Sequence, residues 1–590
     1  MVDKSDPRVP TEGSGGLHVD TEPGRSDADR APGGLLPIAS WLPRYDRRWL
    51  RADIIAGIAV TAMIVPKNLG YADIAGVPVQ NGLYAAAAGA IIYALFCTSR
   101  HISTGPSSAL ATVAGGAVIV TGLGGEDAAS LVAAITLVTG SLFLLLSMLR
   151  MGWIAQFLSK AVVTGFLAGA AIDVVVGELP KLTGTSAEGD SVWREFASWI
   201  GGLGDIHLAT LVVGAVALLA IIGLRFRAPK VPGALVLVAG GLLASYIFDL
   251  GARGVALVGP VPSGLPVPQM PSLDVAVKHV PEIVIASVAL LLIGFSQTAG
   301  DARAFATRHR YRVDVNQESV AQGMANIGAG LFQGMPVSTS LSASSLNESA
   351  GAKTPLASLT TGALVVATLI FLAPLFSQLP KAVLGAVIID AVVFGMIDLP
   401  EFRRLRRVSR FDFWVAGAAV VGVHSAGVLF GIVIGLVLSL GWLVYVSTRP
   451  AMPLLGREPG TQVFRDIDLN PADQTFPGIR VLRLDGGLFF ATAEAFDDRI
   501  RGLMGDDRPL LALVLDLEGV GFVDSQGAAK LTEIQELTTA EGVTLRLARV
   551  KPDVLAVLRA EGFLDRIGAD HIHGNVHRAV EAQLAERDAT

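Results

Sequence analysis

The sequence is poor in cysteine and in charge. Its 590 residues include one cysteine, Cys97, so neither a disulfide framework within the chain nor a cysteine-based zinc site is expected. Charged residues make up 17% of the chain, whereas about 25% is usual for a soluble globular domain. Hydrophobic residues make up 52%, and the mean hydropathy is +0.55. This composition favours a chain that lies largely in a lipid bilayer.

The first 34 residues contain few large apolar side chains and many Gly, Pro, Asp and Ser residues. Such a segment buries too little surface to offset the entropy of ordering it, so 1–34 is predicted to be a disordered tail. The tail also lacks a basic stretch followed by an apolar core, which is the pattern of a cleaved signal peptide. The first apolar span is therefore expected to stay in the membrane.

Residues 35–450 are predicted to form a transmembrane domain, because apolar stretches follow one another through this region. A helix needs about 20 such residues to cross a bilayer. Twelve full spans are predicted, near 53–73, 81–98, 129–149, 160–178, 206–224, 232–250, 281–302, 317–333, 355–376, 381–397, 411–428 and 429–447. Two further segments, 103–121 and 335–350, are shorter and contain Gly-Pro or Met-Pro followed by Ser and Thr, so they are predicted to be broken spans.

The broken spans suggest an internal repeat, because Pro106 in the first matches Pro336 in the second, 230 positions later. Seven segments separate the two copies, and this odd number inverts the second copy in the membrane, as in many secondary transporters. A proline before a short helix leaves N–H groups unpaired at membrane depth, which is tolerable if they face a cavity or a ligand. Two such N-termini, each with its positive dipole end, predict an anion site near the midplane.

Lysine and arginine are concentrated at alternate ends of the predicted spans. They precede the first span and recur in the cluster 403–410, whereas the Pro-rich loop 259–271 and the other loops on its side hold few of them. The positive-inside rule then predicts that both termini are cytoplasmic and that the chain is a multi-pass protein of the inner (plasma) membrane.

The composition changes after Met452. A linker is expected over 451–476, followed over 477–590 by strands IRVLRL, LLALVLDL and VTLRLARV that alternate with helices, the pattern of a small α/β domain. The turn VDSQG places Asp524 and Ser525 at a helix N-terminus. No Walker-type loop, dinucleotide fingerprint or His-Cys cluster occurs here, so we expect no enzyme, no cofactor, no metal and no nucleic-acid partner.

Four stretches of the chain resemble the sulfate permease (SulP) family of anion transporters and exchangers, namely IVPKNLGYADIAGVPVQNGLYAA, SRHISTGPSSA, YRVDVNQE and GLFQGMPVSTS. The C-terminal domain resembles the STAS domain, which is shared by sulfate transporters and anti-sigma-factor antagonists. The resemblance implies a polytopic α-helical membrane protein with 14 segments in a 7+7 inverted repeat and two broken half-helices. It also implies a core and a gate subdomain, an elevator-like movement of the core, and a homodimer.

By position, the resemblance implies a substrate site made of Lys67, Tyr71, Ser107, Ser108, Gln297, Ser338, Thr339, Ser340 and Ser342. Many relatives have Gln where Lys67 stands, Arg where Ala343 stands, and a carboxylate where Gln297 stands. We interpret the first two departures together, because Lys67 can replace the missing cation. A lysine about 14 residues into a span, or roughly 20 Å of helix rise, lies too deep for easy snorkelling, so anion binding is the favoured role.

Two further residues are weaker candidates. Asp301 lies four residues after Gln297 on the same helical face and is a possible site for a coupling ion, H+ or Na+. A salt bridge from Asp301 to Lys67 or Arg303 is the favoured alternative. In the antagonist proteins the phosphorylated serine stands just before the glycine, where this chain has Gln526, so Ser525 is a weak regulatory candidate and is expected to be a helix cap.

The predicted function is secondary active transport or exchange of a small anion, such as sulfate, bicarbonate, chloride or a dicarboxylate. The STAS domain would serve assembly or regulation, with a cytoplasmic protein as its possible partner. A nucleobase carrier of the same fold and a membrane-tethered signalling scaffold are the alternatives.

Overall fold

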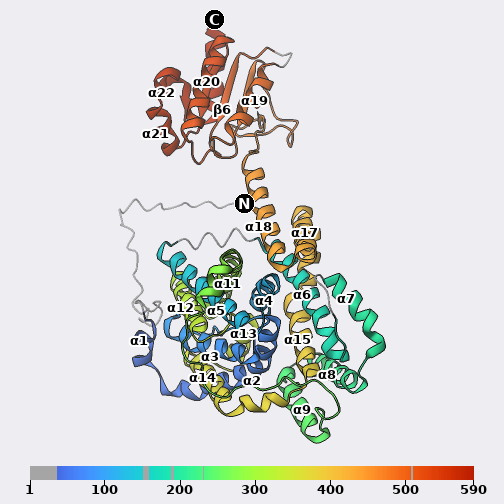
Figure 1. The fold of residues 1–590 in the computed structure, drawn as a ribbon. Helices are drawn as coiled ribbons and strands as arrows, with labels where there is room; N and C mark the ends of the chain where they lie inside the picture. Colours follow the sequence, from blue (N-terminus) through green and yellow to red (C-terminus); the bar gives the residue numbers. More distant parts are fainter. Residues whose placement is uncertain (1–35, 151–158, 188–191, 230, 506–508, 590) are drawn as a thin grey trace, which may run out of the picture. The chain divides into compact units, whose positions relative to one another are not determined.

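The computed structural model describes residues 36–150, 159–187, 192–229, 231–505 and 509–589 (Figure 1). The chain divides into two compact units, a membrane unit that ends at Leu436 and a C-terminal unit that begins at Val437. Each unit is described by itself. The predicted disordered tail, 1–34, lies outside the described residues.

The predicted succession of membrane helices is confirmed. The twelve expected full spans correspond to α2 (Leu50–Ile74), α3 (Val79–Phe96), α5 (Gly125–Met148), α6 (Lys160–Thr183), α8 (Leu208–Arg227), α9 (Gly233–Phe248), α11 (Val280–Arg308), α12 (Val315–Leu331), α14 (Leu356–Ala367), α15 (Lys381–Met396), α17 (Arg410–Ala426) and α18 (Val428–Ser447). Within the described residues, eight helical stretches are long and apolar enough to cross a membrane by length and composition alone. The fold is therefore that of a polytopic α-helical membrane protein.

The two broken spans are each a short strand followed by a short helix. The first comprises β1 (Thr104–Gly105) and α4 (Ser108–Thr121), and the second comprises β2 (Ser338–Thr339) and α13 (Leu341–Ser349). The strands pair antiparallel, with Thr104 opposite Thr339. This pairing holds the entries of the two half-helices side by side.

The register of the repeat differs from the prediction at this point. The N-cap residues of α4 and α13 are Ser107 and Ser340, which are 233 positions apart (340 minus 107), whereas the two prolines are 230 apart. Pro106 directly precedes its cap, but Pro336 lies before β2. The prolines therefore mark where each helix is interrupted without marking equivalent positions.

The helices of the membrane unit form two bundles. In the first, α12 packs on α3 and α5, α14 packs on α2 and α3, and α11 packs on α4 and α5, while α13 packs on α2. In the second, α15 and α17 pack on α6, and α8 packs on α15, α6 and α9. We refer to α2–α5 and α11–α14 as the core bundle and to α6, α8, α9, α15 and α17 as the gate bundle. Contacts between the bundles run mainly through α2, which meets α15 and α9.

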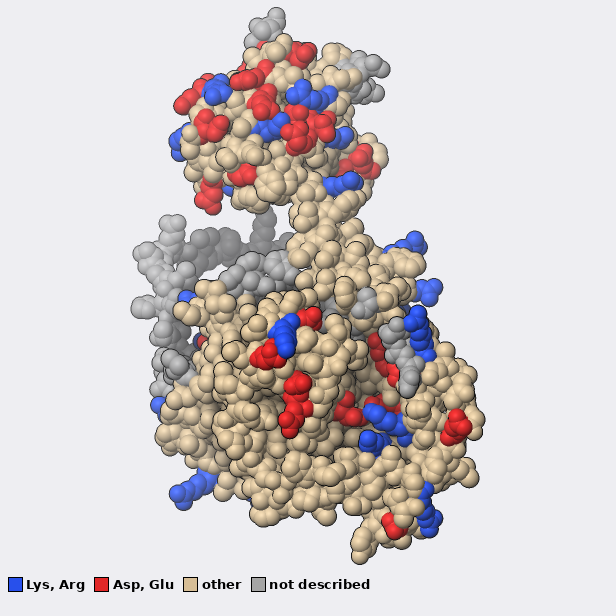
Figure 2. Space-filling view, in the orientation of Figure 1, with Lys and Arg blue, Asp and Glu red and all other residues tan. Residues whose placement is uncertain are grey.

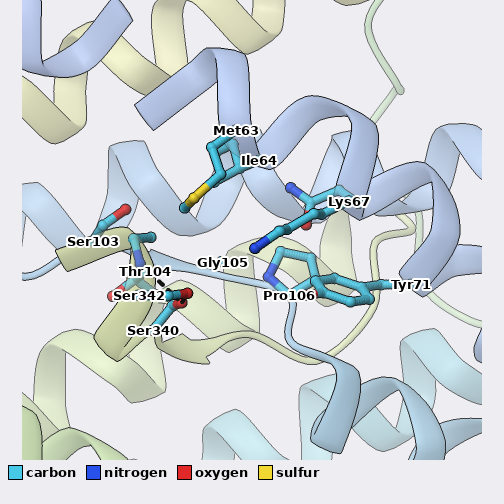
Figure 3. Close-up of a pocket in the computed structure, with 12 residues that line it drawn as sticks. Met63, Ile64, Lys67, Tyr71, Ser103, Thr104, Gly105, Pro106, Ser340 and Ser342 are labelled. Carbon is cyan, nitrogen blue, oxygen red and sulfur yellow. Dashed lines mark hydrogen bonds between the residues drawn. The ribbon is translucent and has the colours of Figure 1, made fainter. Parts of the chain in front are cut away.

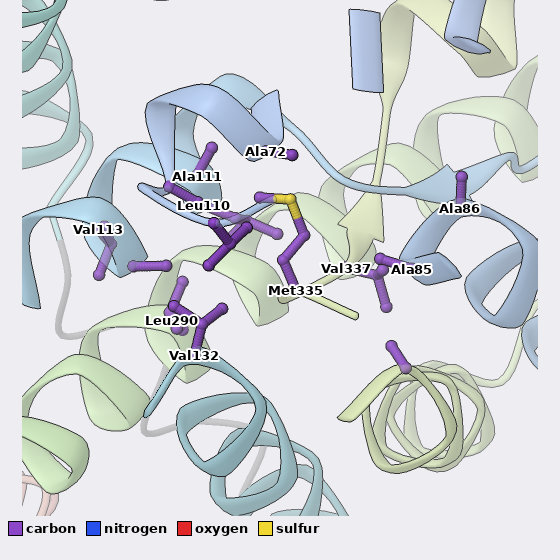
Figure 4. Packing of buried hydrophobic residues seen from close by; sticks show 14 of the residues in the cluster. Ala72, Ala85, Ala86, Leu110, Ala111, Val113, Val132, Leu290, Met335 and Val337 are labelled. Carbon is purple, nitrogen blue, oxygen red and sulfur yellow. The ribbon is translucent and has the colours of Figure 1, made fainter. Parts of the chain in front are cut away.

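Small side chains fill much of the core bundle. Figure 4 shows Ala72, Ala85, Ala86 and Ala111 among larger side chains such as Leu290, and all five residues are at most 1% exposed. Because membrane helices associate through close packing, alanine and glycine allow neighbouring backbones to approach each other. The core bundle is thus a tightly packed body that is able to hold the half-helix entries in place.

The C-terminal unit is an α/β domain, as predicted. Its sheet has the order β5-β6-β7-β8, with all neighbours parallel, and five helices follow or separate the strands. The strands are β5 (Ile479–Arg483), β6 (Ala512–Asp516), β7 (Thr544–Ala548) and β8 (Ile572–His573), and the helices are α19 (Ala493–Met504), α20 (Ser525–Ala540), α21 (Pro552–Ala560), α22 (Phe563–Ile567) and α23 (Val576–Ala589). Figure 2 shows frequent acidic and basic side chains on this unit, whereas the face of the membrane unit drawn there is mostly uncharged.

The stretch 451–476 is folded onto the C-terminal unit, whereas a linker was predicted there. It contains the antiparallel strands β3 (Leu455–Arg457) and β4 (Phe464–Asp466). Leu455, Phe464 and Phe476 are buried in one cluster with Val481 of β5. These apolar side chains attach the stretch to the sheet. Their spacing in the sequence is too irregular to indicate strands.

Candidate functional site

A pocket lies in the core bundle where the two broken spans meet α2 (Figure 3). Residues from α2, from the segment that contains β1, and from the start of α13 line it. They are Met63, Ile64, Lys67, Asn68, Tyr71, Ser103, Thr104, Gly105, Pro106, Ser340, Ser342 and Ala343. Among the described residues, this lining contains one cationic side chain and no carboxylate.

Lys67 supplies the positive charge of this pocket. Its side chain extends from α2 into the pocket, towards the side on which Pro106 and the serines lie (Figure 3). Within the described part of the chain, Lys67 has no hydrogen bond or ion pair, and its charged neighbours are Asp390 and Arg225. These two neighbours pair with each other, with Arg225 donating to both carboxylate oxygens of Asp390 at 2.7 and 2.6 Å. The ammonium group of Lys67 is thus available to a ligand.

The N-termini of the two half-helices add further positive potential. Ser107 caps α4 by accepting a hydrogen bond from the Leu110 N–H at 3.4 Å, and Ser340 caps α13 by accepting one from the Ala343 N–H at 3.4 Å. The remaining N–H groups of each first turn have no partner within the helix, and each helix end carries about half a positive charge. Together with Lys67, they make an environment that suits an anion.

Four of the nine predicted substrate residues line the pocket, namely Lys67, Tyr71, Ser340 and Ser342. The other five do not. Ser107 caps α4, and the neighbouring Ser108 forms a side-chain hydrogen bond with Tyr71. Ser338, Thr339 and Gln297 also lie outside the pocket lining.

Ser338 and Thr339 were predicted to open a helix, but both lie in β2 and are buried. The Ser338 hydroxyl donates to the Gly294 carbonyl of α11 at 3.4 Å. The half-buried Gln297 does not line the pocket, and its buried Oε1 has no hydrogen-bond partner among the described residues. Only the part of this segment after β2 therefore reaches the pocket.

Asp301 forms no salt bridge with Lys67 or Arg303 in the described part of the chain, so the favoured prediction for this residue is wrong. Its Oδ2 accepts a hydrogen bond from the Thr339 hydroxyl at 2.9 Å. Asp301 therefore links α11 to β2, the strand that directly precedes the pocket residue Ser340.

Sequence reasoning missed two buried carboxylates that hold the segments next to the half-helices. The first is Asp53 of α2, which is 0% exposed. Its Oδ1 accepts the N–H groups of Lys353 and Thr354 at 2.7 and 3.2 Å, and its Oδ2 accepts the hydroxyls of Thr354 and Tyr45 at 2.7 and 3.0 Å. Asp53 thus fixes the turn that follows α13.

The second buried carboxylate is Glu318 of α12, which is also 0% exposed. Its Oε1 accepts the N–H and hydroxyl of Thr98 at 2.7 and 2.6 Å and the N–H of Ser99 at 2.8 Å, while Oε2 accepts the Tyr93 hydroxyl. Glu318 thus fixes the loop that leads into β1. An ionisable residue inside a predicted span was the available signal for both carboxylates.

In the C-terminal unit, Asp524 caps α20, and Ser525 is its exposed first residue. Asp524 accepts the Gly527 N–H at 2.8 Å and the Phe490 N–H at 3.0 Å. The prediction that Ser525 is the cap is therefore wrong. Among the described residues of the whole chain, no group of three or more side chains has the arrangement of a metal site.

Each of the two parts of the chain matches a known protein-family model. The model of the sulfate permease family matches residues 50–419, and the model of the STAS domain matches residues 470–579. A probable sulfate transporter of Mycobacterium tuberculosis is 36% identical over 92% of this chain and 98% of the relative. Solute carrier family 26 member 10 of Mus musculus is 30% identical over 93% of this chain and 86% of the relative.

Two solved structures have a similar fold. The murine anion transporter Slc26a9, determined in an inward-facing state, has a TM-score of 0.85 at 21% identity and covers 98% of this chain and 100% of that one. The transmembrane domain of the cyanobacterial bicarbonate transporter BicA has a TM-score of 0.58 at 20% identity and covers 67% of this chain and 99% of that one. These matches confirm the predicted fold.

Proposed function

Because the chain belongs to the sulfate permease family of anion transporters and carries a STAS domain, we propose that it moves a small anion through the Lys67 pocket by secondary active transport or exchange. The observation that carries the proposal is the ammonium group of Lys67, which has no described ion-pair partner and faces two half-helix N-termini. Sulfate, bicarbonate, chloride and dicarboxylates are the candidate substrates. An uncharged nucleobase would leave this positive potential uncompensated, which argues against the nucleobase alternative.

We further propose that Lys67 replaces the cation that many relatives carry at the position of Ala343. Both residues line the pocket, one from α2 and the other from α13. A cation placed on either helix would therefore act on the same ligand.

The test is uptake of radiolabelled anions into liposomes, after a panel of anions has been screened by thermal shift. Lys67→Gln is expected to raise the half-saturating anion concentration several-fold, and the double variant Lys67→Gln/Ala343→Arg is expected to recover most of the loss. Lys278→Gln is the matched control, because the Lys278 side chain is 66% exposed and, among the described residues, pairs with Asp274 on its own short helix, α10 (Leu273–Lys278). Unchanged kinetics in Lys67→Gln would remove this residue from the site.

An elevator-like movement is supported by the origin of the lining residues. All twelve belong to α2, to the β1 segment or to the start of α13, and thus to the core bundle. A ligand bound there would travel with the core bundle as one body, while the gate bundle provides the surface that the core bundle slides along.

Asp301 is the proposed site for a coupling ion. It is linked to β2 through Thr339, so a proton or Na+ at its carboxylate would act on the strand that precedes the pocket serines. Uptake driven by an imposed proton gradient, by a sodium gradient or by neither distinguishes the cases. Asp301→Asn should abolish accumulation driven by the effective gradient but leave exchange. If neither the proton gradient nor the sodium gradient drives accumulation, exchange or a uniport is left.

We also propose that the protein is a homodimer in the plasma membrane with both termini in the cytoplasm. The distribution of arginine and lysine among the loops supports this orientation. Single cysteines introduced into the loop 259–271 or into the C-terminal unit test the orientation when they are labelled in intact cells. The mass of the detergent-purified protein tests the dimer.

A further inference from the structure

Among the ion pairs that the structure describes in the membrane unit, one joins the core bundle to the gate bundle. Lys181 near the end of α6 donates to Asp73 near the end of α2, with 2.5 Å between Nζ and Oδ2. Lys160 of α6 pairs with Glu401 of α16 (Leu399–Val408), a helix that packs on α17 and α6 of the gate bundle. The other ion pairs that the structure describes in this unit stay within one bundle or one segment. Examples are Arg225–Asp390 in the gate bundle and the pair from Arg308 to Glu348 in the core bundle.

The Asp73–Lys181 pair lies on one side of the pocket. Asp73 follows the pocket residue Tyr71 by two positions and Lys67 by six, which is about 9 Å of helix rise towards the end of α2. The same region contains the close approach of α2 to α15, where a Cβ on Gly70 would lie 2.8 Å from Cγ1 of Ile388. On this side of the pocket the two bundles are therefore held together by packing and by charge.

The surroundings of Lys181 allow the pair to separate. Lys181 also donates to Glu178, one turn earlier on α6, at 2.7 Å. The Glu178 side chain is 5% exposed, whereas that of Asp73 is 32% exposed. When the bundles part, Lys181 keeps a carboxylate partner in its own bundle, and Asp73 has access to water. Neither charge is left buried and unpaired, which is the costly outcome for an ion pair.

We propose that Asp73 and Lys181 form a gate between the pocket and this side of the membrane, and that the pair separates once in every transport cycle. The inference rests on the proposed transport by relative movement of the bundles. It assigns to Lys181 a fixed partner, Glu178, and an exchangeable partner, Asp73. The pocket then opens alternately, on the opposite side while the pair is formed and on this side once it is broken.

The test uses reversible cross-linking of the full chain in liposomes. Cys97 is replaced by serine, and Asp73→Cys and Lys181→Cys are introduced together, with each single variant as a control. A short bismethanethiosulfonate reagent should link the pair and reduce anion uptake at least tenfold, and a reducing agent should restore the uptake. The matched control is Arg308→Cys/Glu348→Cys, because this pair lies within the core bundle and its link should leave uptake unchanged.

Binding of the transported anion, measured by thermal shift on the linked protein, separates the possible outcomes. The proposal is supported if the linked protein binds the anion but does not transport it. It is overturned if the linked protein transports as fast as the reduced protein, or if the two cysteines do not link. If neither the linked nor the reduced protein transports any anion, while the Cys97→Ser parent is folded and also inactive, the proposed function fails together with this gate.

A second variant avoids cysteine chemistry. Asp73→Asn removes the pair between the bundles and leaves the Lys181–Glu178 pair in place, whereas Glu178→Gln removes the pair within α6. Asp73→Asn is expected to change the maximal uptake rate several-fold with less than a twofold change in the half-saturating concentration. The same maximal rate as in the unmodified chain would contradict the gate.

Discussion

At the scale of single residues, the membrane unit uses charged side chains within its helices in two ways. The Lys67 ammonium faces a pocket without a described partner, whereas the carboxylates of Asp53 and Glu318 are surrounded by donors. A buried carboxylate is tolerable when hydrogen bonds replace its lost hydration. The first pattern indicates a place for a ligand, and the second indicates a structural anchor.

Glu318→Gln is expected to destabilise the protein, because an amide replaces one carboxylate oxygen with a donor that faces other donors. The loss should be about 1–3 kcal/mol per group left unsatisfied. Thermal unfolding in detergent measures this loss as a lower Tm. The exposed Glu126→Gln at the start of α5 is the matched control and should leave the Tm unchanged; an equal Tm for both variants would contradict the anchor role.

Asp524→Ala should expose the start of α20, because the Gly527 and Phe490 N–H groups both donate to this side chain. Loss of an N-cap costs about 1 kcal/mol. Hydrogen exchange at these two amides is expected to accelerate in Asp524→Ala and to stay unchanged in Ser525→Ala. Faster exchange in the serine variant would return the capping role to Ser525.

The sequence was sufficient to find Lys67, because a lysine deep in an apolar span is rare for a physical reason. The sequence was not sufficient to show that Ser338 and Gln297 lie outside the pocket lining. Family position predicts which segment a residue belongs to, but the direction of its side chain depends on local backbone, and β2 turns Ser338 towards Gly294 of α11. Asp301 shows the same limit, since its partner Thr339 belongs to a strand that has no periodic signal.

At the scale of elements, the prolines and hydroxyl residues predicted both half-helices, while β1 and β2 were not foreseen. Two-residue strands are too short to show the alternation by which a strand is recognised. Their pairing depends on two segments more than 200 positions apart meeting in space. The same limit explains the displaced register, because proline positions alone do not fix where a helix begins.

Gly115 of α4 is the element-scale prediction. A Cβ at this position would lie 2.2 Å from the carbonyl oxygen of Ile74, which is backbone and does not move aside easily. Gly115→Ala is expected to lower the stability by about 1–3 kcal/mol or to prevent folding. Gly223→Ala in α8 is the matched control, because no heavy atom of the described residues lies within 4 Å of its Cβ position. The Tm of both variants, measured by thermal unfolding, tests this prediction. An unchanged Tm for Gly115→Ala would contradict the close approach of α4 to Ile74.

At the scale of the whole molecule, the division into a membrane unit and a C-terminal unit was predicted from composition. The predicted boundary was late, because the stretch 451–476 belongs to the C-terminal unit. Its Leu455, Phe464 and Phe476 contribute to the core of that unit although the intervening sequence is polar and rich in turns. Composition averaged over a window does not register three separated apolar anchors.

Ending the chain after Pro450 is expected to leave measurable anion flux, because the pocket and both bundles lie before this point. Uptake per molecule of reconstituted protein is the measurement, with the full chain as the reference. Complete loss of flux in a truncated protein that still binds the anion would favour the signalling-scaffold alternative over an independent transport unit.

The backbone pairing of Thr104 with Thr339 also has a consequence for biosynthesis. When the ribosome has made the first repeat, α4 is present but the strand that holds its entry has not yet been synthesised. The pocket therefore cannot exist until at least 235 further residues (339 minus 104) have been synthesised. We expect a nascent chain arrested before β2 to insert its helices yet remain unable to bind the anion, so that assembly of the site is a late event in the life of each molecule.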